Sequence, residues 1–192
     1  MNDTKSMLAD IFIKSPEQKI LSLFAMNPDR AFYGREISRK LGISLGATHA
    51  ALLSLEKNGL LSSVLIGKTK LYSPEESHQV FRSFRILNTL LVLEPLVADF
   101  RSVSRRVLLF GSYADGTFTS SSDLDLMVVS NEKREILRII DSFKRKSGLD
   151  IRPIIKDQVE WTRMGKDSPE FFSELARGIT LWEKPFEEPG FY

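Results

Sequence analysis

Cysteine is absent from the 192 residues of the chain. Without thiols there is no disulfide framework, no thiolate metal site and no cysteine nucleophile, and the reducing cytoplasm becomes the expected compartment. Long apolar runs are missing too, since stretches such as residues 90–93 are far too short to span a bilayer. Asp3, Lys5 and Asp10 occupy the region where a signal peptide has its apolar core. We therefore expect a cytoplasmic protein without a membrane partner.

A large excess of charge of either sign is also missing. The formal net charge is +2, which is too small to indicate a polyanionic partner by itself. Basic residues slightly outnumber acidic ones in residues 1–75, whereas residues 76–192 are near neutral. Hydrophobic residues make up 42% and charged residues 27%, which is typical of a folded globular chain. The length suits one ordinary domain or two small ones.

Start and stop signals in the first third of the chain indicate three helices. The first begins at Ser15, where a capping hydroxyl precedes a proline and a glutamine follows three residues later. The second covers about residues 35–41 and stops at Gly42, and the third is capped by Ser44 and ends at residues 58–59. The residues expected on the inner face of the third helix are Thr48, Ala51, Leu52 and Leu55.

A hairpin is expected directly after these helices, with short strands at residues 62–66 and 69–73 around Gly67 and Lys68. The pattern resembles the winged helix-turn-helix domains of bacterial and archaeal regulators. The positions that carry this resemblance are the stretch 35–44 together with Leu52, Leu55, Glu56, Gly59 and Leu60. The resemblance implies that the third helix enters the major groove of DNA and that the hairpin forms a wing beside the backbone.

The DNA-contacting positions implied by this resemblance are few. On the outer face of the third helix, only Ser44 and His49 offer hydrogen bonds to base edges. On the wing, Lys68 and Lys70 could neutralise phosphates and give salt-sensitive, weakly selective binding of duplex DNA. The alternative is that these are ordinary solvated side chains on a module that binds protein.

Residues 75–94 are expected to form a long amphipathic connecting helix that ends near Pro95. Its apolar face is expected to contain Val80, Phe84, Leu87 and Leu91, joined by Phe81 and Leu90. This face has to be covered, either by the flanking domains or by a second copy in a homodimer, and the sequence leaves both open. The expected domains are residues 1–75, the winged helix-turn-helix domain, and residues 76–192, the connecting helix and a second domain.

The second domain contains a pattern with chemical meaning. A buried strand is expected just before Gly111 and Ser112, and another strand opens with Asp123 and Asp125. Two carboxylates two residues apart on a strand project from one face and can share a divalent cation, for which oxygen ligands select magnesium or manganese. Gly111 lets the backbone approach a phosphate, and Ser112 brings a hydroxyl and helix-terminal N–H groups to the same anion. Ordinary turn and cap chemistry is the alternative reading.

Gly111-Ser112, a spacer and then Ser122-Asp123-Leu124-Asp125 resemble the signature of the polymerase-beta-like nucleotidyltransferases, and the minimal nucleotidyltransferases most closely. The resemblance implies a magnesium-dependent enzyme that transfers a nucleoside monophosphate from a triphosphate, expected to be ATP, to a hydroxyl. Minimal members often act as antitoxins that adenylylate a partner toxin, so a protein acceptor is expected. The alternative is a DNA-binding regulator whose second domain is a non-catalytic nucleotide sensor or partner-binding module.

The expected fold is α+β, with a helical, winged N-terminal domain followed by a mixed sheet flanked by helices. The family implies a third carboxylate, acting as base or metal ligand, on the strand after a helix. Asp150 lies there, although the family's acid could instead align with Arg152. Asp115 stands where relatives often carry a basic residue, which removes a positive charge near the phosphates. The remaining expected elements are helices at residues 132–146, 159–163 and 169–177 and strands at 149–155 and 179–183.

Overall fold

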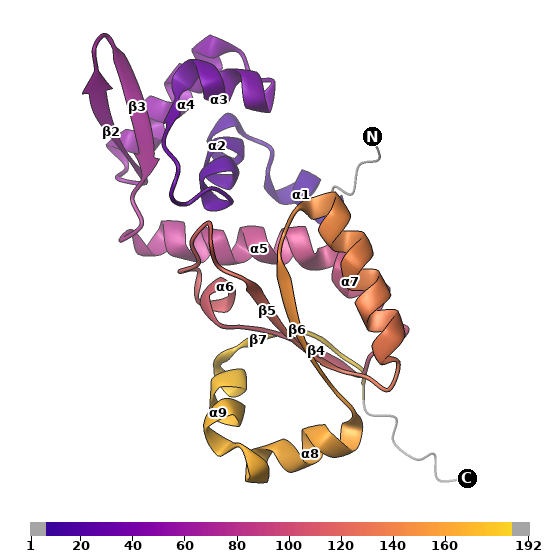
Figure 1. Cartoon of the computed structure of the whole chain (residues 1–192). Coiled ribbons are helices and arrows are strands. Elements are labelled where there is room, and N and C mark those ends of the chain that lie inside the picture. Colours follow the sequence, from indigo (N-terminus) through magenta and orange to yellow (C-terminus); the bar gives the residue numbers. More distant parts are fainter. Residues whose placement is uncertain (1–6, 186–192) are drawn as a thin grey trace. The chain divides into compact units, whose positions relative to one another are not determined.

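The computed structural model describes residues 7–185 of the chain (Figure 1). These residues fall into two compact units. The first comprises the residues up to Val92 together with Gly116–Ser122, and the second comprises Leu93–Asp115 and the residues from Asp123 onward. The expected α+β class is confirmed, because helices and a small antiparallel sheet precede a mixed sheet with its own helices. The division into domains of residues 1–75 and 76–192 remains a prediction.

Three helices of the first unit begin and end where the capping signals place them. α2 (Pro16–Ala25) has the full capping box at Ser15, and α3 (Gly34–Leu41) ends at Gly42 in the left-handed conformation. α4 (Leu45–Lys57) is capped by Ser44, whose hydroxyl accepts a hydrogen bond from the N–H of Ala47. Its four buried residues are the predicted ones, Thr48, Ala51, Leu52 and Leu55. Local chemistry therefore defines these helices before any packing.

The hairpin of the first unit is also confirmed. β2 (Leu61–Ile66) and β3 (Thr69–Pro74) pair in antiparallel register. β3 pairs on its other side with β1 (Phe32–Tyr33), a two-residue strand that the sequence does not predict. The short helix α1 (Met7–Phe12) is likewise not predicted. The sheet and helices enclose a core of buried residues that includes Ile20, Phe24, Phe32, Ile37, Leu52 and Tyr72.

The connecting helix α5 (Gln79–Phe100) differs from the prediction in two ways. It continues through Pro95 instead of ending there, although proline removes one backbone hydrogen bond from a helix interior. Buried residues on the next turn, including Leu96 and Phe100, offset that loss by packing. The predicted apolar stripe is also partly wrong, since Val80 is 62% exposed whereas the polar Arg85 is 3% exposed.

Arg85 anchors the loop Gly116–Ser122, which belongs to the first unit. Its guanidinium donates a hydrogen bond to the carbonyl of Phe118 and lies 4.1 Å from the centre of that ring. The N–H of Ser120 donates to the Asp29 carboxylate at 2.6 Å, and this bond lowers the pKa of Asp29. The loop that joins the two halves of the nucleotidyltransferase-like pattern is thus held by contacts at both Phe118 and Ser120.

The second unit is built on a four-stranded sheet in the order β6-β5-β4-β7. The central strand β4 is antiparallel to both neighbours, whereas β6 is parallel to β5, so the expected mixed sheet is confirmed. Helices α8 and α9 lie on one side of the sheet and α7 on the other (Figure 1). The elements are β4 (Arg106–Phe110), α6 (Ser112–Asp115), β5 (Leu124–Val129), α7 (Lys133–Ser147), β6 (Ile151–Lys156), α8 (Gln158–Asp167), α9 (Pro169–Arg177) and β7 (Ile179–Glu183).

A compact apolar cluster fills the space between this sheet and helices α8 and α9. Leu108 and Met127, which are partners on β4 and β5, pack with Met164 and Leu175 from the two helices. Because side chains alternate along a strand, Phe110 and Asp125 lie on this same face one step further along. None of the helices in residues 7–185 has both the length and the apolar character that a membrane span requires.

Candidate active site

Asp125 stands at the centre of the candidate site. It is the second residue of β5, and its Cα partners are Phe110 on β4 and Arg152 on β6. Residues that are partners in neighbouring strands point to the same side of the sheet, so Arg152 lies beside Asp125. Asp123 precedes the strand by one residue and is exposed. The strand therefore presents the predicted pair of carboxylates, one half-buried and one exposed.

The electrostatics around Asp125 oppose its negative charge. Burial raises the pKa of Asp125, and the negative charges of Asp123 and Glu174 act in the same direction, while Arg152 opposes them. Carboxylates held close together repel each other, and a bound cation relieves that repulsion. The pair is consequently arranged in a way that favours a positive ion beside Asp125.

Gly111, which with Ser112 forms the first half of the sequence pattern, packs closely against the Asp125 carboxylate. Its φ of +69° lies in the left-handed region, and a Cβ at this position would lie 2.8 Å from Oδ2 of Asp125. Only glycine combines that backbone conformation with that approach. Ser112 follows at once as the first residue of α6, a single helical turn. The two halves of the pattern, twelve residues apart in the sequence, therefore meet at Asp125.

A cavity of about 140 Å³ opens next to Gly111. Asp115 and Gly178 contribute to its lining, as do Glu174 and Arg177 from α9. Sequence reasoning missed both of these α9 residues, because no local signal links a late helix to the glycine turn. Asp115 stands where relatives often carry a basic residue. Arg177, from a distant segment of the chain, places a positive charge in the lining of the same cavity. The cavity therefore joins the glycine turn to the end of α9.

Asp150 lies on the same face as the carboxylate pair. Its carbonyl accepts a hydrogen bond from the N–H of Leu124, which continues the β5–β6 register by one residue and puts Asp150 next to Asp123. Its side chain is 62% exposed and forms an ion pair with Lys144, and this hydrogen bond raises the pKa of Lys144. Asp150 and Arg152 thus both border the carboxylate pair.

Asp157, which directly follows β6, stabilises the start of a helix. Its carboxylate accepts hydrogen bonds from the N–H groups of Val159 and Glu160 and caps α8. Because this carboxylate accepts two backbone hydrogen bonds, it is held at the start of the helix. Asp157 lies six residues beyond Ile151, the residue that pairs with Leu124 of β5. It is therefore a helix cap, which leaves Asp150 as the acidic residue of this strand that lies next to the pair.

The donor set of the site suits magnesium bound together with a substrate. Among residues 7–185, no three or more His, Cys, Asp or Glu side chains are grouped so as to hold a metal ion. Magnesium commonly binds through one or two carboxylates, with substrate phosphates and water completing its shell. Asp123 and Asp125 fit that arrangement, and they would hold the metal only in company with a triphosphate.

The predicted DNA-contacting residues all lie in the first unit, and they differ in whether their side chains already bind a partner within it. Ser44 uses its hydroxyl to cap α4, whereas His49 is exposed on the outer face of that helix. His49 and Lys68 both line a cavity of about 350 Å³. Lys70 forms an ion pair with Glu56 at 2.9 Å. The structure therefore leaves His49 and Lys68 directed to solvent and ties Ser44 and Lys70 to partners within the unit.

Residues 93–178 match the family model described as a nucleotidyltransferase domain. The matched segment contains Gly111, Asp123, Asp125 and Asp150, and it covers less than half of the chain. No curated protein matches the chain. The resemblance that the sequence pattern indicated is confirmed for this segment, and the chain carries a nucleotidyltransferase domain there.

Proposed function

We propose that this protein is a magnesium-dependent nucleotidyltransferase that moves a nucleoside monophosphate, with ATP as the donor, onto a hydroxyl group. The observation that carries the proposal is the close approach of Gly111 to the Asp125 carboxylate within the matched domain. Phosphoryl transfer requires that the carboxylates that bind the metal lie next to the backbone that a phosphate can approach. Here they meet without an intervening side chain.

Each residue around the pair has a role in this proposal. Asp123 and Asp125 would hold magnesium together with the triphosphate, and the bound metal would supply positive charge against the charge that develops on the phosphates. The backbone at Gly111 and the guanidinium of Arg177 approach the phosphate oxygens. The acceptor oxygen bonds to the α-phosphorus while the bond from that phosphorus to the bridging oxygen breaks, and pyrophosphate leaves. Asp150 accepts the proton of the attacking hydroxyl.

The acceptor that we favour is a hydroxyl on a partner protein, as in antitoxin-like minimal nucleotidyltransferases. Asp150, the proposed base, is 62% exposed on its side chain, so a bulky acceptor can reach it. A small-molecule acceptor would instead need a cavity at that point, and the cavity beside Gly111 measures only about 140 Å³. In this proposal the first unit selects or regulates the target.

We expect magnesium with ATP to raise the melting temperature of the protein, measured by calorimetry. A ligand that binds only the folded state at 100 times its Kd stabilises it by about 2.7 kcal/mol. The shift should vanish in the variant with Asp123→Asn and Asp125→Asn, because amides keep the shape but lose the charge that the metal needs. The matched control, Asp141→Asn with Asp167→Asn, removes two exposed charges elsewhere and should keep the shift. A full shift in the first variant would place the nucleotide elsewhere.

A second candidate function is a DNA-binding regulator whose nucleotidyltransferase domain senses nucleotide without turnover. Two observations favour it: Asp150 is engaged by Lys144, and Arg152 lies beside Asp125 where a third acid could have been. In this case the first unit supplies the DNA contacts. Its basic and polar groups are too few for strong sequence reading, so the binding would depend mainly on phosphates.

We expect duplex DNA binding by this protein to weaken steeply with salt, as measured by fluorescence anisotropy. Lys68→Ala should lower the affinity for all sequences alike and reduce the salt dependence, because it removes a phosphate contact. Lys70→Ala should have a smaller effect, since Glu56 already pairs with that ammonium group. Lys57→Ala, at the exposed end of α4, is the control and should change little. Binding confined to one sequence and unaffected by Lys68→Ala would contradict this expectation.

A further inference from the structure

The loop Gly116–Ser122 joins the two halves of the sequence pattern of the candidate site, yet it belongs to the first unit. It follows Asp115, the last residue of α6, and it ends immediately before Asp123. α6 is bonded back to the glycine turn, because the N–H groups of Ala114 and Asp115 donate to the carbonyl of Gly111. One end of the loop is therefore connected to Gly111, and the other end to a carboxylate of the pair.

The first half of this loop packs against α5. Gly116 approaches the helix so closely that a Cβ there would lie 2.6 Å from the carbonyl oxygen of Arg82. Two residues further on, the carbonyl of Phe118 accepts a hydrogen bond from Arg85, whose guanidinium lies 4.1 Å from the centre of the Phe118 ring. Phe118 is 2% exposed and Arg85 is 3% exposed. Buried contacts within the first unit therefore hold this half of the loop.

The second half of the loop is a tight turn that Asp29 holds. Within the turn, the N–H of Thr119 donates to the hydroxyl of Ser122 at 2.9 Å, and the N–H of Ser122 donates to the carbonyl of Thr119 at 3.2 Å. The N–H of Ser120 donates to the Asp29 carboxylate at 2.6 Å. Because the turn is bonded within itself, an anchor at Ser120 also restrains Asp123, which directly follows the turn.

Asp29 is itself fixed to the helices of the first unit. It lies between α2 and β1, and the next residue, Arg30, forms an ion pair at 2.7 Å with Glu36 of α3. The Arg30 guanidinium also lies 4.6 Å from the centre of the Phe32 ring, and Phe32 is buried in the core of the unit. Energetic coupling between distant sites can travel through such contiguous contacts. A movement of α3 would therefore reach Ser120 through Asp29.

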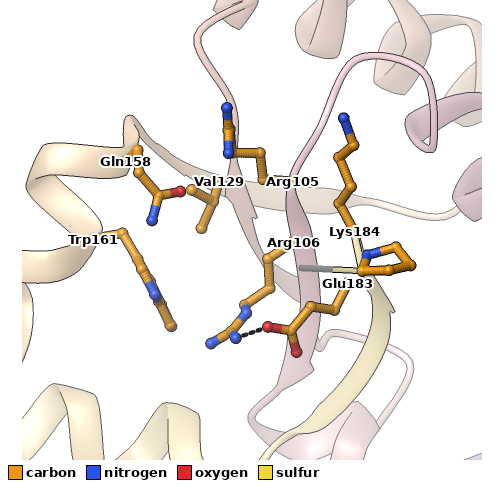
Figure 2. Close-up of a pocket in the computed structure, with 8 residues that line it drawn as sticks. Arg105, Arg106, Val129, Gln158, Trp161, Glu183 and Lys184 are labelled. Carbon is orange, nitrogen blue, oxygen red and sulfur yellow. Dashed lines mark hydrogen bonds and ion pairs between the residues drawn. The ribbon is translucent and has the colours of Figure 1, made fainter. Parts of the chain in front are cut away.

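The opposite end of the sheet is held by contacts within the second unit. Figure 2 shows the ion pair between Arg106, at the start of β4, and Glu183 of β7. One step further, the N–H of Lys184 donates to the carbonyl of Arg105 at 2.8 Å. Gly111 directly follows the other end of β4. The second unit thus fixes the sheet end away from the candidate site, whereas contacts of the first unit hold the loop at the site.

We propose that the first unit positions the carboxylate pair through this loop, with Asp29 as a positioning residue. The inference rests on the proposed transfer reaction, since it concerns the placement of Asp123 beside Asp125. Asp29 acts by holding the turn at Ser120 and not by touching the substrate. A displacement of about 1 Å, caused far from the chemistry, can lower a reaction rate by about 100-fold. A change in the first unit that moves Asp29 therefore changes the rate of transfer.

Asp29→Ala is expected to lower the single-turnover transfer rate at saturating magnesium–ATP by about 10- to 100-fold. The melting temperature without ligand should change little, because Asp29 is exposed. Asp29→Glu keeps a carboxylate for the N–H of Ser120 and should recover part of the rate. The matched control is Glu183→Ala, which removes another exposed, paired acid at the far end of the sheet and should keep the wild-type rate. Equal losses in the two alanine variants, or a loss that follows the melting temperature, would overturn the proposal.

A measurement without turnover separates this proposal from the proposed function. The backbone amide resonances of Asp123 and Asp125 are compared by NMR in the wild type and the two alanine variants, without nucleotide. Asp29→Ala should shift both resonances, and Glu183→Ala should shift neither. A wild-type protein that transfers nothing would contradict the proposed function, and the NMR comparison would still decide whether the first unit positions the pair. Resonances of Asp123 and Asp125 that stay unchanged in Asp29→Ala would overturn the inference.

Discussion

Asp150→Asn is expected to lower nucleotidyl transfer by roughly 100- to 10,000-fold while leaving nucleotide binding nearly intact. The amide cannot accept the proton of the attacking hydroxyl, but Asp123 and Asp125 still hold the metal–triphosphate. Single-turnover transfer rates and the melting shift with magnesium and ATP, measured on the same preparation, separate the two effects.

Asp141→Asn is the matched control for Asp150→Asn. Asp141 is an exposed acid on α7 whose charge also acts on Lys144 and raises the pKa of that lysine. Losing it should alter transfer little, because Asp141 is not on the β5–β6 register beside the pair. Full transfer by Asp150→Asn would remove Asp150 from the mechanism. A wild-type protein that binds nucleotide and transfers it to no acceptor would instead favour the sensor, with Arg152 at the third position.

Gly111→Ala is expected to lower both magnesium–ATP binding and transfer by about 100-fold or more. A Cβ at position 111 would lie 2.8 Å from Oδ2 of Asp125, so the carboxylate has to move out of its place in the pair. The backbone φ of +69° adds strain of about 1–2 kcal/mol for any residue with a Cβ. Displacing one of only two metal-binding carboxylates removes the electrostatic stabilisation on which phosphoryl transfer depends.

Gly148→Ala separates strain from displacement. Gly148 ends α7 with a φ of +73°, and no atom lies within 4 Å of the position that its Cβ would take. Both alanine variants should therefore unfold at a lower denaturant concentration by similar amounts. Only Gly111→Ala should lose magnesium–ATP binding. Equal activity in the two variants would mean that the contact with Asp125 has no role in catalysis.

Features fixed by local chemistry could be predicted from the sequence. Helix caps depend only on residues within one turn. In the structure, helices start after Ser15 and Ser44 and a helix stops at the left-handed Gly42, as the sequence predicts. The alternation that puts Asp123 and Asp125 on one face is equally local. The same reasoning failed at Pro95, because it considered only the backbone hydrogen bond that proline removes. The burial of Leu96 and Phe100 stabilises the helix by more than that loss.

The remaining parts of the candidate site depend on tertiary structure. Arg177 reaches the Gly111 cavity only because β7, which follows it, pairs with β4. Whether Asp150 or Arg152 borders a given carboxylate depends on the register between β5 and β6, and a shift of one residue would turn both side chains to the opposite face. Lys144 was missed as the partner of Asp150 because six residues separate them across a helix end. No periodicity in the sequence contains this information.

The central claim is tested most directly by incubating the purified protein with magnesium and ATP labelled at the α-phosphate, alone and with cell extract. We expect label on a protein in the extract and release of unlabelled pyrophosphate. Both should disappear when magnesium is omitted and in the variant with Asp123→Asn and Asp125→Asn. Protein, nucleic acid and small molecules are then separated, and each is counted for label. Label that persists in the double variant, or a wild-type protein that stays folded and labels nothing, would contradict the account.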